Sequence, residues 1–332
     1  MKTKLLRINE LTAGRFLIAT LLVLSAISCA SHSNKDAASI QSTSQTLGEP
    51  ESGQLCFDTD DQVADALVAA AQAHDEHQVH KLLGPGWKDL LSGDKVEDTN
   101  AFNEFAKRAA EHRRIERLPG GLSILHVGAD DWAYPIPIVQ SAEGKWFLDA
   151  EAGRHELLAR RIGKNELEAI QICRIYVKAQ REYHGQPRDG GQVATYAQKI
   201  ISMPGKMDGL YWKVPPGGQE SPFGHLIAEA KLEGYQPTPG KHGPYHGYHF
   251  RVLTRQGSAA PGGKKDYVVN GKMLDGFSLI AYPVEYGASG IMTFIVNQDG
   301  VVFQKDLGPD TMADSRGTKT YDPDDSWKPV KE

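Results

Sequence analysis

Cysteine, charge excess and long apolar runs are all scarce in this chain of 332 residues. It contains three cysteines and no C-x-x-C pair, which excludes the zinc and redox sites built on that spacing. Lysine and arginine number 37 against 42 aspartates and glutamates, so the net charge is −5. Since no long basic run offsets this balance, it argues against a nucleic-acid partner.

Familiar catalytic motifs are also missing. The chain has no G-x-S-x-G elbow, no H-E-x-x-H helix, no P-loop and no G-x-G-x-x-G turn. The sequence therefore predicts no cofactor and favours a protein that is not an enzyme. A hydrolase with an unrecognised site stays open as the alternative.

No apolar run reaches the ~20 residues that a membrane-spanning helix needs. Residues 16–28 are uncharged, and they follow a basic stretch that contains Lys2, Lys4, Arg7 and Arg15. A basic segment followed by a short apolar one is typical of a secretory signal peptide. We expect this signal over residues 1–28, and it predicts export.

The segment Ala26-Ile27-Ser28-Cys29 resembles a bacterial lipobox, in which small residues precede a cysteine that is acylated and becomes residue one. Position 26 departs from that motif, which more often has leucine there. Ordinary cleavage after Ala30 is the alternative. The resemblance implies lipidation of Cys29, a membrane partner through the lipid, and an outer-membrane location facing the periplasm, because residue 30 is not aspartate.

Residues 29–54 are rich in serine, glutamine and glycine and have few apolar side chains, which predicts a disordered tether. Without Cys29, two cysteines remain, and Cys56 and Cys173 could form a disulfide in an oxidising compartment. However, apolar residues surround Cys173 in AIQICRIYV, and a buried cysteine needs no partner. The sequence leaves the disulfide open.

A first α+β domain is expected over residues 55–150. Thr59 and Gln62 have the spacing of a capping box and precede a helix predicted over about 60–74. A second helix is expected in NAFNEFAKRAA, and three strands in LSILHVG, YPIPIVQ and KWFLDA. Helices followed by antiparallel strands resemble a cystatin-like or nuclear-transport-factor-like cone.

A second domain is expected over residues 151–332, again helix packed on antiparallel sheet. Apolar residues at helical spacing predict a long helix over about 152–182, which Gly163 could kink or split. Asn270-Gly271 and Asp299-Gly300 are predicted turns between strands, and GYHFRVLT and GFSLIAYPVEYG supply two further strands. A helix covering a meander of about four strands would bury both apolar faces.

Several long motifs make the chain similar to a known family. They are LLGPGWKDLLSGD, DDWAYPIPIV, KWFLDAEAG, RRIGKNELEAIQICRIYVKAQREY, DGLYW and EYGASGIMTFIVNQDGVVFQKDLGPDT. Over roughly residues 55–330 they resemble exported bacterial proteins with domain of unknown function 2950. The resemblance implies a cell-envelope location and no established activity. The C-terminal half is also similar, more weakly, to type IV pilin-like domains.

Two groups of histidines are candidate metal ligands. If Tyr245–Leu253 is a strand, His246 and His249 point to opposite faces and cannot chelate one ion with His242. A second group, in HDEHQVH, comprises His74, His77 and His80, of which the first two would be neighbours on a helix. Exposed histidines are common at such polar helix ends, so the sequence predicts no metal site.

Adjacent carboxylates and clustered aromatics are the remaining candidates. Asp130 and Asp131 would point apart on an extended chain, so a polar turn is favoured over an acid and base pair. Aromatic residues gather between prolines and glycines, where they could line a groove for a glycan or peptide or pack under a loop. This cluster comprises Tyr211, Trp212, Phe223, Tyr245 and Tyr248.

The sequence as a whole favours a two-domain envelope lipoprotein that acts as a non-catalytic binding or assembly module. Its partner would be an envelope protein, a peptide or a glycan. An envelope hydrolase and an accessory to pilus or secretion machinery are the alternatives.

Overall fold

The computed structural model describes residues 48–240 and 243–331 of the chain, which belong to one compact unit, Thr46–Glu332. These residues form seven helices and several mainly antiparallel sheets, so the predicted α+β class is confirmed. The expected signal peptide, Cys29 and most of the expected tether lie outside the described residues. The expected boundary between residues 150 and 151 stays a prediction.

Four helices open the described part of the chain. They are α1 (Asp60–Gln72), α2 (Glu76–Leu83), the 3-10 helix η1 (Pro85–Leu90) and α3 (Lys95–Glu111). The capping box predicted at α1 is confirmed, because the Thr59 hydroxyl accepts from the Gln62 backbone N–H while the Gln62 side chain binds the N-cap backbone. Asp94 caps α3 by accepting from the N–H groups of Val96 and Glu97.

A five-stranded antiparallel sheet follows, with the order β1-β2-β4-β5 and β3 paired to β2. Its strands are β1 (Arg113–Leu118), β2 (Leu122–Val127), β3 (Trp132–Ala133), β4 (Ile138–Gln140) and β5 (Trp146–Leu148). The sequence missed β1, because only Ile115 of its residues is even partly buried and no apolar alternation results. The sheet and α1 to α3 enclose a first core around Val63, Leu67 and Leu125.

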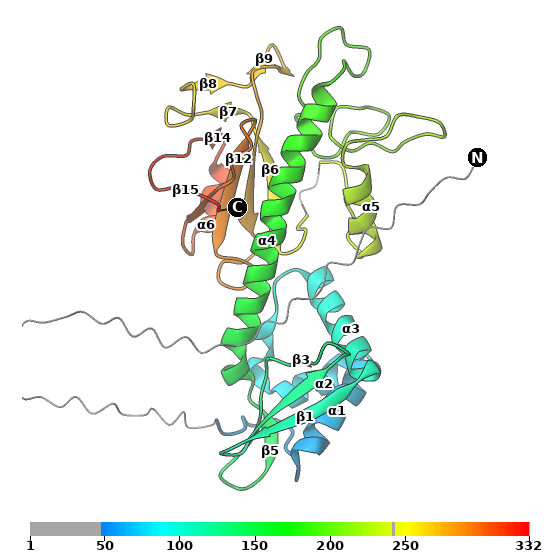
Figure 1. Cartoon of the computed structure of the whole chain (residues 1–332), viewed down its shortest axis with the longest axis vertical. Helices are drawn as coiled ribbons and strands as arrows, with labels where there is room; N and C mark the ends of the chain where they lie inside the picture. The colour runs from blue at the N-terminus through cyan, green and yellow to red at the C-terminus, as the bar shows by residue number, and fades with distance from the viewer. Residues whose placement is uncertain (1–47, 241–242, 332) are drawn as a thin grey trace, which may run out of the picture. The chain divides into compact units, whose positions relative to one another are not determined.

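Helix α4 (Ala150–His184) is one continuous helix of 35 residues. Gly163 does not split it, since the residues on either side stay helical. Near its start α4 contributes Leu157 to the first core, and further along it contributes Cys173 and Tyr176 to a second. Figure 1 shows α4 passing from the first sheet to the second.

The second sheet has the order β15-β13-β12-β11-β6, and each of these neighbouring strands pairs antiparallel with the next. Its strands are β6 (Tyr248–Leu253), β11 (Ser278–Pro283), β12 (Met292–Asn297), β13 (Phe303–Asp306) and β15 (Lys328–Pro329). The turn predicted at Asp299-Gly300 joins β12 to β13. The turn predicted at Asn270-Gly271 joins β9 (Val268–Val269) to β10 (Lys272–Met273), and both turn residues have positive φ, as a type I′ turn requires.

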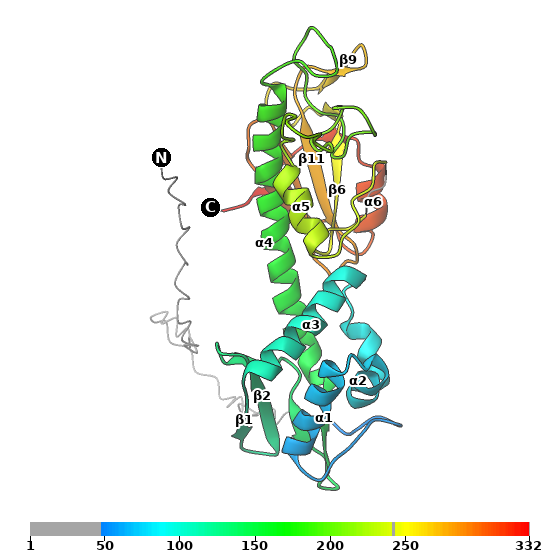
Figure 2. The ribbon, with the colours of Figure 1, turned by 90° about the vertical axis from the view of Figure 1, so that its right-hand side faces the viewer.

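Helices cover both faces of this sheet because its strands bury residues on each side. Helix α4 and the short α5 (Gly224–Leu232) lie on one face (Figure 2), over a core that includes Phe250, Leu279 and Phe294. On the other face α6 (Thr311–Gly317) packs near Leu253 and Ile280. Short strands β7 (Arg255–Gln256), β8 (Lys265–Asp266) and β14 (Thr320–Tyr321) form a further sheet. Among the described residues, no helix has the length and apolar character needed to span a membrane.

Candidate functional site

A cavity of about 830 Å³ lies between α4, α5, strand β6 and the segments 198–203, 234–240 and 243–245. Its walls are mostly apolar: Ile172 comes from α4, Leu226 and Ile227 from α5, and Phe250 and Val252 from β6. A volume of ~300–1,000 Å³ with an apolar lining and a few polar groups is typical of ligand sites. The cavity is therefore the leading candidate for a binding site.

Two of the five aromatic residues proposed for a groove reach this cavity. Phe223 and Tyr245 line it. Phe223 also belongs to the second core, which buries Trp212 and Tyr248 away from the cavity. The Trp212 ring N–H donates to the Gln219 carbonyl at 3.0 Å, and the Tyr248 hydroxyl donates to the Met292 carbonyl at 2.9 Å. Tyr211 is partly buried, and its hydroxyl accepts from Lys231 Nζ at 3.1 Å. The cluster is thus mainly core packing with two side chains at the cavity wall.

The polar part of the cavity wall is built on the Asp94 cap of α3. Asp94 is almost fully buried, and its Oδ2 accepts from the Tyr235 hydroxyl at 3.0 Å and from the Gly247 N–H at 3.3 Å. Tyr235 in turn accepts from the His246 N–H at 3.1 Å. Burial and the Asp94 charge raise the pKa of Tyr235, so it keeps its proton and remains a donor.

His246 lies in the turn before β6 and bridges two glutamates. Its Nδ1 is 2.8 Å from Glu168 of α4, and its Nε2 is 3.1 Å from Glu233, just after α5. Burial lowers the pKa of His246, but the hydrogen bond to Glu168 and the charges of both glutamates outweigh it, so the pKa is raised. Both ring nitrogens are thus held by carboxylates, and neither is available as a general base.

His246 and His249 do not share the strand that the sequence predicted over Tyr245–Leu253. The strand begins at Tyr248 and not at Tyr245, so alternation along it does not separate His246 from His249. Instead His246 has a positive φ of 48° in a turn, whereas His249 lies on the strand. His242 lies outside the described residues. Within the described ranges, no group of three histidine, cysteine, aspartate or glutamate side chains is arranged to hold a metal ion.

A second buried contact joins α3 to α4 beside this turn. Asn165 is 0% exposed, and its Nδ2 donates to Glu97 Oε2 at 3.2 Å and to the Ser289 carbonyl at 3.0 Å. Burial raises the pKa of Glu97, although the hydrogen bond from Asn165 opposes that shift. Gly247 fits here because a Cβ would come within 2.4 Å of Asn165 Nδ2. These contacts hold α3 and α4 together beside the turn that precedes β6.

Comparison with known proteins places the chain in a family. Residues 54–330 match the family model described as Protein of unknown function (DUF2950). The chain belongs to the DUF2950 family. Neither the curated proteins nor the solved structures contain a match to it. The pilin-like and cone-like resemblances therefore stay predictions.

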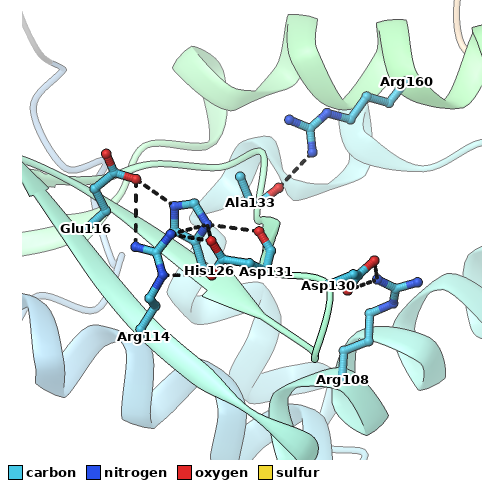
Figure 3. Close-up of polar contacts among 8 residues, drawn as sticks. All are labelled: Arg108, Arg114, Glu116, His126, Asp130, Asp131, Ala133 and Arg160. Carbon is cyan, nitrogen blue, oxygen red and sulfur yellow. Dashed lines mark hydrogen bonds and ion pairs between the residues drawn. The ribbon is translucent and has the colours of Figure 1, made fainter. Parts of the chain in front are cut away.

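The adjacent carboxylates of the DUF2950 chain bind different arginines (Figure 3). Arg108 Nη1 donates to both Asp130 oxygens, at 2.9 and 2.8 Å, while Arg114 Nε donates to Asp131 Oδ1 at 2.7 Å. His126, beside Arg114, is held by Glu116 at 2.9 Å. The Arg114 hydrogen bond lowers the pKa of Asp131, so this residue stays ionised and is a poor general acid. The arrangement fits the polar turn that the sequence favoured.

The three histidines of HDEHQVH are not on one helix in this DUF2950 chain. Helix α1 ends at Gln72 and α2 begins at Glu76, so His74 lies between them and the expected helical pair with His77 is wrong. His80 stacks on Trp87, with ring centroids 3.3 Å apart. The sequence analysis did not predict this contact, because it depends on η1, a helix that was not expected and that places Trp87 beside α2.

Cys56 and Cys173 are both free in the structure, and the disulfide that the sequence left open stays a prediction. Cys56 is exposed, whereas Cys173 is fully buried in the second core of the DUF2950 chain. Burial raises the pKa of Cys173 to about 12, which keeps it as an inert thiol. Its role is that of a small apolar side chain.

Proposed function

We propose that this protein is a non-catalytic binding module of the cell envelope whose ligand enters the cavity beneath α5. The cavity is the observation that carries the proposal, because its volume and apolar walls suit a ligand with an apolar body. Asp94 and Tyr235 are already bonded to each other and to the backbone, so they shape the wall and keep one end of it polar. The ligand would be held mainly by apolar contact.

The hydrolase alternative has less support. His246 follows the cavity-lining Tyr245 in the chain, but each of its ring nitrogens already contacts a carboxylate. A hydrolase needs a base within reach of a nucleophile or water, oriented by a third group. The role in pilus or secretion machinery rests on the resemblance of a long helix over an antiparallel meander to pilin-like domains.

The proposed location follows from the N-terminal segment. An acylated Cys29 would anchor the protein to a membrane, with residues 29–54 as the tether and the folded part exposed to the periplasm. A tether of that length reaches ~25–30 Å, enough to let the cavity meet ligands near the membrane surface.

Filling the cavity tests the proposal. Ala230 lines the cavity on α5, and Leu232, two residues along, is 90% exposed and does not line it. We expect Ala230→Trp to weaken binding of the apolar probe 8-anilinonaphthalene-1-sulfonate at least about tenfold in titration calorimetry, and Leu232→Trp to leave it unchanged. Thermal unfolding would verify that both variants are folded. Equal probe binding by the two folded variants would count against the cavity as the site.

A further inference from the structure

Strand β6 is an edge strand, and its backbone groups divide into two sets. It pairs with β11 alone, with Tyr248 opposite Pro283 and Leu253 opposite Ser278. The Val284 N–H donates to the Gly247 carbonyl at 2.9 Å, and Pro283 has no N–H to offer Tyr248. In an antiparallel ladder the hydrogen-bonded pairs alternate. The backbone groups of residues 249, 251 and 253 therefore face β11, and those of 248, 250 and 252 face outward.

Both ends of this outward edge are already occupied. The N–H and carbonyl of Tyr248 exchange two hydrogen bonds with Tyr245, and the Thr254 carbonyl accepts from the Tyr267 N–H at 2.8 Å. Between these ends, the outward groups of Phe250 and Val252 have no hydrogen-bond partner within the described part of the chain. The edge is thus open over one short stretch.

The cavity lies at this open stretch. Phe250, Arg251 and Val252 all line it, although successive side chains of a strand point to opposite faces. The Arg251 guanidinium is held by the Ser315 and Thr318 carbonyls, so contact of the cavity with all three residues points to the strand's backbone as part of its wall. Phe250 is only 9% exposed. A buried backbone N–H or carbonyl without a hydrogen-bond partner costs free energy. A ligand that forms hydrogen bonds with these groups removes that cost and therefore binds more tightly.

We propose that the ligand is an extended peptide segment that adds to β6 as a short extra strand. Its backbone pairs with the N–H and carbonyl groups of Phe250 and Val252, and its side chains on one face enter the cavity under α5. This inference rests on the proposed function and names its ligand class. Strand addition to an open edge is a general mode of peptide recognition, in which the main chain supplies affinity and pockets select alternate side chains.

The two closed ends limit the length of the bound segment. Tyr245 and Tyr267 cap the edge on either side of residues 250–252, so three or four peptide residues pair, which is ~10–14 Å of extended chain. Leu226, Ile227 and Ala230 of α5 are the apolar residues that the inward side chains would meet. An acyl chain would fill the same volume but leave the outward groups of β6 unpaired.

Backbone chemistry separates a peptide from other apolar ligands. The probe is a pool of acetylated, amidated tetrapeptides that alternate valine or leucine with threonine, and its control is the same pool with alternate backbone nitrogens methylated. We expect the full chain to bind members of the first pool and to bind the matching methylated peptides at least about tenfold more weakly, because each lost pair leaves a buried group unsatisfied. In hydrogen exchange, the amides of Phe250 and Val252 should be protected by peptide.

A matched pair of variants tests the strand from the protein side. Val252→Pro removes an outward N–H without removing a ladder bond to β11, a position where an edge strand tolerates proline, and Val252→Ala keeps that N–H. We expect the proline variant to bind peptide about tenfold more weakly than the alanine variant, with both still binding 8-anilinonaphthalene-1-sulfonate. If the wild-type protein binds the fluorescent probe but no peptide, the peptide inference is wrong and the proposed function stands. The same holds if it binds peptide and backbone methylation does not weaken that binding. If the wild-type protein binds neither the probe nor any peptide, the proposed function is wrong as well.

Discussion

Among single residues, His246 has the most constrained position. It adopts a positive φ, its backbone N–H donates to Tyr235, and its ring contacts glutamates from α4 and from the end of α5. Backbone strain of this kind costs of order 1–3 kcal/mol and persists where surrounding contacts compensate. The ion pairs supply that compensation, and they tie the far end of α5 to the rest of the cavity wall.

The ion pairs of His246 predict a pH dependence of stability. Its pKa in the folded protein lies above the ordinary 6.5, so the folded state binds this proton more tightly than the unfolded chain does. The stabilisation is fully present below about pH 6.5 and is lost as the pH rises through the folded pKa. We expect the free energy of unfolding in urea to fall over this range in the wild type and to fall less in His246→Gln. The exposed His155 gives the control, since His155→Gln should follow the wild type.

Gly247 predicts a second effect at the residue scale. It has φ of 69°, and a Cβ would lie 2.4 Å from Asn165 Nδ2, so Gly247→Ala combines backbone strain with a clash at a fully buried side chain. We expect a loss of about 2–4 kcal/mol in the free energy of unfolding. Gly287 has a similar φ of 78°, but an added Cβ there would meet no atom within 4 Å, so Gly287→Ala should cost only about 1–2 kcal/mol. Equal losses in the two variants would show that Asn165 can move away.

Among the elements, α4 shows how local propensity and packing act at different positions of one helix. Its two interior glycines have opposite surroundings, since Gly163 is open while a Cβ on Gly153 would lie 2.5 Å from the Ile136 Cα. Residue 153 must therefore be glycine, because the segment before β4 leaves no room for a Cβ. Neither packing nor backbone conformation requires glycine at residue 163. No contact in the structure explains why residue 163 is glycine.

These two glycines make a paired prediction. Gly163→Ala should raise the free energy of unfolding by about 0.5–1 kcal/mol, because alanine loses less backbone entropy in a helix and meets no neighbour here. Gly153→Ala should lower it by at least about 2 kcal/mol, because the backbone of Ile136 must shift. Urea unfolding of both variants measures the difference. A destabilised Gly163→Ala would imply that this position needs its glycine for a contact outside the described structure.

At the scale of the whole molecule, the two main cores are linked by α4 and by a small set of polar contacts. Asn165 bonds Glu97 of α3, and Tyr235 bonds the Asp94 cap of the same helix. Both links involve buried groups, which are costly to break because each partner would be left unsatisfied. The cavity wall thus depends on residues that are far apart in the sequence.

The proposed anchor gives a prediction for the full-length protein in cells. If Cys29 is acylated, the wild type should fractionate with membranes, preferably the outer membrane, and Cys29→Ser should shift most of the protein to the soluble fraction. Cys56→Ser is the control, since that cysteine is exposed but lies in the folded part. Recovery of the wild type entirely in the soluble fraction, with an N-terminus at Ala30 or later, would contradict the anchor.

Local patterns in the sequence determined helices α1, α3 and α4 and several of the strands. The α1 capping box, the long helix of α4 and the turns at Asn270-Gly271 and Asp299-Gly300 depend on residues a few positions apart, so they could be read directly. The family match likewise covers residues 54–330, as the long motifs had indicated. Strand β1 was missed because its charged side chains carry no apolar alternation, and it forms only by pairing with β2.

The candidate site was decided by tertiary structure. Its cavity joins α3, α4, α5 and β6, and the partners of His246 are 78 and 13 residues away in the chain, as its contacts with Glu168 and Glu233 show. The sequence grouped Trp212 and Tyr248 with Phe223 and Tyr245 because all are aromatic and near prolines and glycines, but only the second pair lines the cavity, and Phe223 does so from within the same core as the first pair. The open edge of β6 is likewise invisible in sequence, because pairing is a property of neighbouring strands and no residue type marks its absence.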